Sequence, residues 1–118
     1  DEVDYINFHG TSTLINDKVE TLAVKNTFNG KALNIPSSST KSMVGHPQGA
    51  SGALGVTVSA LSLKNGFMTP TINMENPDPE CDMDYVSNVG REKRIDVAIS
   101  NCISFGSKNS AIVLKRFE

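Results

Sequence analysis

Short apolar runs alternate along this chain with polar loops rich in serine, threonine and asparagine, a pattern typical of alternating strands and helices. Four apolar or aromatic runs predict strands, over residues 3–8, 33–37, 95–102 and 110–116. Pro36 keeps the second of these short or peripheral, because proline cannot donate to a strand ladder. The order strand–loop–helix, twice over and then strand–loop–strand, predicts an α/β fold.

The first predicted helix begins near Asp17. Glu20 follows Asp17 by three residues, a spacing that resembles a capping box. We expect this helix to run to about Asn29, with Gly30 as its left-handed C-cap. A modest apolar stripe indicates one buried face, which consists of Val19, Leu22 and Ala23.

The second predicted helix, residues 49–65 with Gly66 as its cap, is apolar or small almost all round. Such a helix is typically buried on every side. Its hydroxyl residues and Lys64 make it a poor membrane span. Three small residues would let neighbouring backbones approach it closely, namely Gly49, Gly52 and Gly55.

Three polar loops follow predicted strands and cover residues 9–16, 38–48 and 103–109. Ligands of open α/β sheets bind beyond the carboxyl ends of the strands, so we expect these loops to converge on one site. The first two loops hold His9, Lys41 and His46. The N-terminal end of the second helix is expected to point at the second histidine. Two imidazoles and an ammonium suit the stabilisation of a developing oxyanion or enolate.

Each candidate also has a purely structural interpretation. His9 can be a satisfied histidine at a strand end, His46 an ordinary loop residue and Lys41 a solvated charge. Cys81 and Cys102 are more typical of small apolar residues than of activated nucleophiles. Taken alone, these residues indicate an α/β half-domain with a polar site.

Composition and charge exclude several classes of function. The 118 residues suffice for one small domain, and 11 basic against 13 acidic residues give a net charge of −2. No basic cluster points to nucleic acid or to an anionic membrane as a partner. Two widely separated cysteines argue against a zinc ribbon or disulfide framework and favour a reducing, cytoplasmic setting. Without a methionine or a signal peptide at its start, the chain is expected to be a segment of a longer protein.

Five motifs in order resemble those of a known family. They are HGTST (9–13), NDK-x-ET (16–21), SSTKSM-x-GH (38–46), PTIN (70–73) and NPDPECD (76–82). The series resembles the C-terminal half of the β-ketoacyl-[acyl-carrier-protein] synthases, the condensing enzymes of fatty-acid and type II polyketide synthesis. The resemblance covers essentially the whole chain, so residues 1–118 are expected to form one ketosynthase C-terminal domain.

This resemblance implies a fold and partners. The family has a thiolase-like fold, in which two similar α/β halves form a five-layered αβαβα sandwich, and its members are usually dimers. The 49–65 helix would then be a buried central helix between two sheets. Expected partners are an N-terminal half carrying the nucleophilic cysteine, the acyl carrier protein, and a second ketosynthase unit in a homodimer or heterodimer. No bound cofactor is expected, because the substrate is carried on the phosphopantetheine arm of the carrier protein.

The resemblance also implies catalytic roles in decarboxylative condensation. His9 and His46 match the pair that holds the malonyl thioester oxygen and supports decarboxylation. Lys41 and Glu20 match a supporting pair near the second histidine.

The implied substrate contacts lie on the first and third loops. Thr11 and Thr13 match hydroxyls that contact the phosphopantetheine arm. Phe105 matches a gating phenylalanine whose backbone N–H contributes to the oxyanion hole, and Gly106 follows it as a further substrate-binding position.

Departures from the family pattern qualify these roles. The cysteine motif is not in this chain, so the chain alone is expected to condense nothing. Ser104 and Ser107 replace glycines, and Ile103 replaces a phenylalanine. Gly55 stands where many members carry a glutamate of a structural cation site, so no metal is expected. The alternative is a non-catalytic subunit of the chain-length-factor type that shapes a partner's acyl tunnel, against which the retained histidines and lysine argue.

Overall fold

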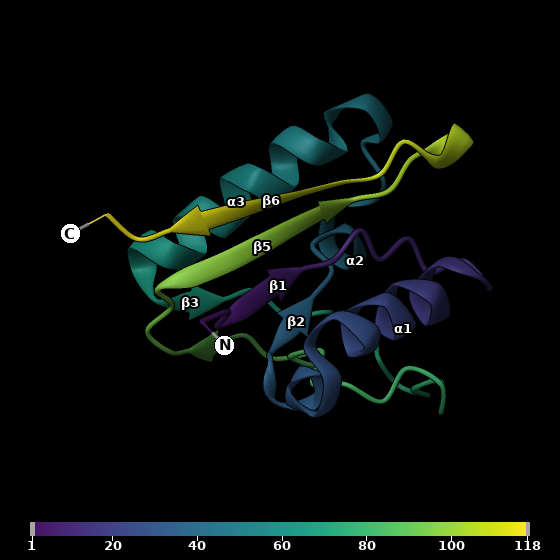
Figure 1. The fold of residues 1–118 in the computed structure, drawn as a ribbon, viewed down its shortest axis with the longest axis horizontal. Coiled ribbons are helices and arrows are strands. Elements are labelled where there is room, and N and C mark those ends of the chain that lie inside the picture. Colours follow the sequence, from purple (N-terminus) through teal and green to yellow (C-terminus); the bar gives the residue numbers. More distant parts are fainter. Residues whose placement is uncertain (1, 118) are drawn as a thin grey trace.

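The computed structural model describes residues 2–117 and contains the mixed sheet of an α/β fold. Its four strands lie in the order β2-β1-β5-β6 (Figure 1). β1 pairs in parallel with both β2 and β5, and β6 runs antiparallel to β5. The strands are β1 (Tyr5–Asn7), β2 (Ser37–Ser38), β5 (Val97–Cys102) and β6 (Ser110–Lys115).

Two helices, α1 (Asn16–Phe28) and α3 (Ser51–Asn65), cover opposite faces of this sheet. Successive side chains of a strand point to opposite faces, so β1 contributes to two cores. Tyr5 belongs to one hydrophobic cluster with Leu63 of α3, and Ile6 belongs to the other with Val24 of α1. Figure 1 shows α3 along the β5–β6 side and α1 across from it, beside β2.

The beginning and end of α1 differ from the capping prediction. The helix begins at Asn16, and no side chain makes a capping hydrogen bond at its N-cap. Asp17 lies inside the first turn, where its Oδ1 accepts the N–H of Ser12 at 3.1 Å. At the other end Asn29 has φ 52° and opens a 3-10 helix, η1 (Asn29–Asn34), so Gly30 is not the C-cap. Because η1 takes up residues 29–34, the second strand forms at 37–38 instead of 33–37.

The predicted C-terminal end of α3 is confirmed, whereas its predicted burial on every side is confirmed only for the side that faces the sheet. Gly66 is a left-handed C-cap with φ 63°, and its N–H donates to the carbonyl oxygen of Ser62. The sheet-facing side is tightly packed, since a Cβ on Gly55 would lie 2.5 Å from Oγ of Ser100. On the other side Leu61 is 51% exposed. Within residues 2–117, α3 is therefore covered on its sheet side, and its remaining apolar surface is open.

Short elements complete the fold. Lys41–Val44 forms a one-turn helix, α2, within the segment expected to be a loop, and Gln48–Ala50 forms the 3-10 helix η2 before α3. β3 (Phe67–Met68) and β4 (Arg91–Glu92) make a two-stranded antiparallel sheet that the sequence pattern does not reveal. Among the helices of residues 2–117, none has the length and apolar character needed to cross a membrane.

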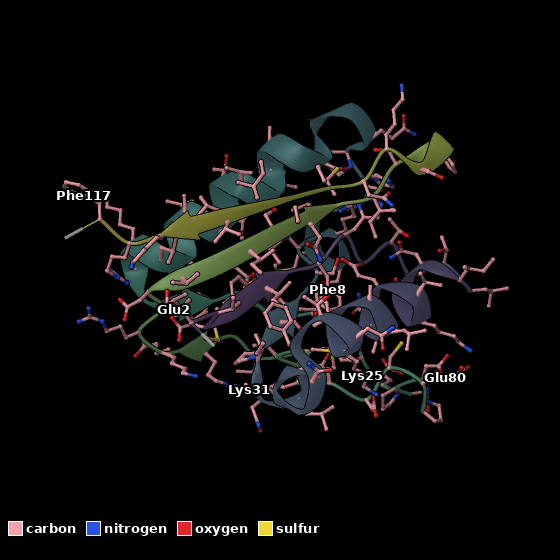
Figure 2. The ribbon with its side chains drawn as sticks, viewed as in Figure 1. Glu2, Phe8, Lys25, Lys31, Glu80 and Phe117 are labelled. Carbon is pink, nitrogen blue, oxygen red and sulfur yellow. The ribbon has the colours of Figure 1, made fainter. Side chains whose placement is uncertain are left out.

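The proline-rich connection between β3 and β4 is held against α1 by ion pairs. Lys18 lies 3.4 Å from Asp78 and also pairs with Glu80, while Lys25 pairs with Asp82. Figure 2 shows Lys25 and Glu80 on the same side of the molecule as α1. These ion pairs hold the connection in place, although residues 76–84 form no regular helix or strand.

Candidate functional site

The loops that follow β1 and β2 bring the two histidines together. Parallel strands end at the same edge of a sheet, and His9 comes two residues after β1 while His46 follows α2 beyond β2. The two ring centroids lie 5.4 Å apart and the ring planes meet at 85°. The predicted convergence of the first two loops is thus confirmed.

The surroundings of His46 determine which ring nitrogen carries its proton. Nδ1 accepts the backbone N–H of Gln48 at 3.1 Å, and the hydroxyl oxygen of Ser51 lies 3.0 Å from the same atom. A backbone N–H can only donate, so Nδ1 must offer a lone pair. In the neutral ring, the assigned tautomer therefore has its hydrogen on Nε2, which makes Nε2–H a hydrogen-bond donor.

His9 is held in its uncharged form. Its side chain is only 6% exposed. Burial, followed by the positive charge of Lys41 and by His46, lowers the pKa of His9 to about 4, against the opposing effect of Asp17. At neutral pH the ring is thus an uncharged imidazole. Among the described residues, Nδ1 of His9 has no hydrogen-bond partner.

Glu20 fixes the loop that carries His9. Its carboxylate is 2% exposed and accepts the backbone N–H groups of His9 at 2.8 Å and Gly10 at 2.9 Å. Side-chain N–H groups of Asn101 at 3.1 Å and Asn16 at 3.3 Å complete four hydrogen bonds. Burial raises the pKa of Glu20 even though these hydrogen bonds oppose it. Glu20 therefore lies beneath His9, joining β1 to the end of β5, and is not a helix cap.

Lys41 is the first residue of α2 and is partly buried, which differs from the solvated charge that composition alone favours. Burial lowers the pKa of Lys41, while the nearby Cys102 and Glu20 act in the opposite direction. The turn before it is fixed by buried hydroxyl groups. Thr40 Oγ1 accepts a hydrogen bond from the Nδ2–H of Asn7 at 2.7 Å. The hydroxyl of Ser39 donates to the carbonyl oxygen of Gly10 at 2.7 Å.

A pocket of about 600 Å³ opens beside His46, and His9 is not among the residues that line it. Thr11, Thr13, Lys41 and His46 all contribute to its lining. Thr13 Oγ1 also accepts the backbone N–H of Asn16 at 3.2 Å, which leaves its hydroxyl hydrogen available. Another part of the wall comes from the proline-rich connection and its neighbours, including Thr71, Asn73, Cys81 and Tyr85. Sequence reasoning did not assign this wall; its only signal was the PTIN and NPDPECD motifs.

The third loop does not join the pocket. Phe105 is fully exposed at the start of a short 3-10 segment, η3 (Phe105–Ser107), and neither it nor Gly106 lines the pocket. Gly106 has φ 74° and Ser107 has φ 61°. The end of β5 reaches the site through the hydrogen bond from Asn101 to Glu20 and through Cys102, which acts on the charge of Lys41. The predicted convergence of three loops on one pocket is therefore confirmed for the first two loops only, while Ile103 and Asn109 of the third line a separate pocket with Thr13 and Glu20.

The described part of the chain contains no cluster of metal-ligating side chains, and its Cys81 is not an activated nucleophile. Over residues 2–117, no group of three or more histidine, cysteine or acidic side chains is placed to hold a metal ion. Burial raises the pKa of Cys81, which disfavours the reactive thiolate. The arrangement instead offers an uncharged buried imidazole at His9, beside the His46 ring and the partly buried ammonium of Lys41 that line a pocket, which suits stabilisation of negative charge on a substrate oxygen.

Replacement of His9 by glutamine is expected to alter how stability depends on pH. The unfolded chain takes up a proton at His9 near pH 6.5, whereas the folded chain does so only near pH 4. His9 therefore lowers the free energy of unfolding as pH falls through this window, and His9→Gln removes that contribution. Urea unfolding of both proteins at pH 7 and pH 4.5 measures it. Equal losses in the two proteins would contradict an uncharged, buried His9.

Three comparisons with known proteins agree. Residues 1–75 match the family model described as "Beta-ketoacyl synthase, C-terminal domain". The chain is 49% identical over 116 residues to 3-oxoacyl-[acyl-carrier-protein] synthase 2 of Coxiella burnetii, covering 98% of this chain and 28% of the relative. It is 48% identical over 116 residues to the tetracenomycin polyketide synthase ketoacyl synthase alpha subunit of Streptomyces glaucescens, covering 98% of this chain and 27% of that subunit.

Solved structures show the same architecture. The ishigamide ketosynthase/chain length factor superposes with a TM-score of 0.95 and 34% identity, over 99% of this chain and 28% of that one. AntDE:AntF, a type II acyl-carrier protein in complex with its ketosynthase, gives a TM-score of 0.93 and 36% identity, over 99% and 29%. The chain thus spans little more than a quarter of the length of the relatives it matches.

Proposed function

Because the chain belongs to the β-ketoacyl synthase family and matches its C-terminal domain, we propose that it supplies the histidine side of the active site of a β-ketoacyl-[acyl-carrier-protein] synthase. The observation that carries this proposal is the pair His9 and His46, 5.4 Å apart between ring centroids. One imidazole is kept neutral by burial, and the other has a hydrogen on Nε2.

The proposed chemistry is decarboxylation of a malonyl thioester. The bond between its carboxylate carbon and the α-carbon breaks, carbon dioxide leaves, and the electron pair moves into an enolate. Negative charge then grows on the thioester oxygen, where imidazole N–H groups donate hydrogen bonds that strengthen as the charge develops. The Lys41 ammonium adds a favourable field, and Glu20 acts by holding the backbone of His9.

Condensation requires a group from outside this chain. The α-carbon of the enolate attacks the carbonyl carbon of an acyl-cysteine thioester, the carbon–sulfur bond breaks, and a cysteine thiolate leaves. We assign that cysteine to the N-terminal part of the protein, since Cys81 lies in the pocket wall with a raised pKa. The isolated 118-residue chain is therefore expected to be inactive in condensation.

The pocket suits an extended substrate arm. Thr11 and Thr13 line it together with His46, and we assign their hydroxyls to the phosphopantetheine of an acyl carrier protein. We further assign Phe105 and Gly106 to a gate that becomes ordered against the rest of the protein, because the side chain of Phe105 is fully exposed here. Partnership with a carrier protein and pairing with a second ketosynthase unit follow from the same assignment.

The test is an assay of the complete protein that contains this domain. With malonyl-[acyl carrier protein] we expect release of carbon dioxide and formation of acetyl-[acyl carrier protein], detected by mass spectrometry of the carrier protein. The isolated domain, mixed with an acyl thioester and the same substrate, should form no β-ketoacyl product. If a folded, complete protein binds the carrier protein yet releases no carbon dioxide, the non-catalytic subunit of chain-length-factor type replaces this proposal.

A further inference from the structure

Ser51 is the first residue of α3 and makes an unusual contact for that position. Its side chain is buried, and its hydroxyl oxygen lies 3.0 Å from Nδ1 of His46. The N-cap of α3 is Ala50, and no side chain makes a capping hydrogen bond there. The hydroxyl of Ser51 is thus directed at the histidine and does not cap its own helix.

His46 has few other constraints. The imidazole is exposed in the described chain, and added Cβ atoms on Gly45 and Gly49 would meet nothing within 4 Å. The ring is located by the N–H of Gln48, by Ser51 and by edge-to-face contact with the ring of His9. Of the two hydrogen-bonding groups, the Ser51 hydroxyl is placed more rigidly than the N–H of Gln48, because α3 is held close to β5 at Gly55.

We propose that Ser51 is a positioning residue that holds the His46 ring with Nε2–H directed to the substrate. Because Nδ1 also accepts the N–H of Gln48, the Ser51 hydroxyl donates to the same lone pair. A flipped or rotated ring would lose both hydrogen bonds. The inference rests on the proposed function, since it concerns the orientation of a histidine to which that function gives a catalytic role.

The test compares three variants of the complete protein. Ser51→Ala removes the hydroxyl, and Ser51→Thr retains one. Ser59→Ala is the matched control, because Ser59 is a fully buried serine of the same helix whose hydroxyl has no hydrogen-bond partner among the described residues. Two readouts are used: kcat and KM for malonyl thioester decarboxylation, and the ¹⁵N resonances of labelled His46, which report the protonation of each ring nitrogen.

Ser51→Ala is expected to lower kcat about threefold to tenfold, the range for loss of one hydrogen bond between neutral groups, with little change in KM. It should also broaden or shift the Nδ1 resonance of His46. Ser51→Thr should restore both, and Ser59→Ala should change neither. Unchanged kcat and unchanged ¹⁵N resonances in Ser51→Ala would overturn the proposal, as would an equal loss of kcat in Ser59→Ala.

The two readouts separate this inference from the function on which it rests. If Ser51→Ala changes the ¹⁵N resonances of His46 while the unmodified protein releases no carbon dioxide, Ser51 does position the ring and the proposed reaction is what fails. If the unmodified protein is active and the resonances of His46 are insensitive to residue 51, the reaction stands and the positioning role is overturned.

Discussion

His46→Ala in the complete protein is expected to lower kcat for malonyl thioester decarboxylation by about 10²- to 10³-fold, the cost typical of removing one donor to a developing oxyanion. The substitution deletes the Nε2–H group of His46. The hydrogen of the neutral ring is on Nε2 because Nδ1 accepts hydrogen bonds from Gln48 and Ser51. KM should change much less, because the hydrogen bond is stronger to the enolate oxygen than to the thioester carbonyl.

This histidine gives a cleaner test than its neighbour. His46 is exposed in the described chain, so its truncation leaves little cavity, whereas His9 is buried against the loop that Glu20 holds. Thr27→Ala is a suitable control, since Thr27 is exposed on α1 and, among residues 2–117, its hydroxyl donates only to the carbonyl oxygen of Ala23 in its own helix. Decarboxylation by His46→Ala at the rate of Thr27→Ala would refute the proposed role of His46.

The sequence predicted the site better than it predicted the local structure around it. His9 and His46 could be placed together because parallel strands end at one sheet edge, a rule that needs only the order of elements. The one-turn helix at Lys41–Val44 was missed, since four residues carry too short a periodicity to distinguish a helix from a loop. The two-residue strands β3 and β4 were missed for the same reason.

Glu20 shows how a local pattern can be misleading. Its spacing from Asp17 fits a capping box, yet its carboxylate binds the backbone after β1 and the side chain of Asn101 at the end of β5. A side chain near the start of a helix can serve either purpose, and the choice depends on which strands lie beside the helix. That information resides in the sheet order and not in the residues near position 20.

The third loop and the second helix leave apolar side chains exposed within the described residues. The gating role expected of Phe105 needs a surface to close against, and its side chain is fully exposed. Similarly, α3 is apolar around most of its circumference, yet the sheet covers one side. The matched relatives are more than three times the length of this chain, and in the proposed complete protein their additional residues would supply both surfaces.

Glu20→Ala is expected to destabilise the protein by about 3–5 kcal/mol, as is typical when a buried, fully bonded charged group is removed. The buried backbone N–H groups of His9 and Gly10 would lose their acceptor, and a cavity would remain beside Asn101. The midpoint of urea unfolding of the complete protein measures this loss. Because the backbone of His9 would no longer be fixed, kcat for decarboxylation should fall as well.

Glu20→Gln separates the charge of this residue from its hydrogen bonds. Glutamine keeps the volume and one oxygen acceptor, but its amide N–H groups must face at least one backbone N–H, at a cost of about 1–3 kcal/mol. Since burial raises the pKa of Glu20, the neutral amide also relieves part of the desolvation penalty. The net loss of stability should therefore be clearly smaller than in Glu20→Ala.

Glu92→Ala, at an exposed position on β4, is the control and should leave the midpoint of urea unfolding unchanged. If Glu20→Gln is as unstable as Glu20→Ala, the negative charge is essential to the loop. If Glu20→Ala unfolds at the same midpoint as Glu92→Ala, the carboxylate does not hold His9 in place.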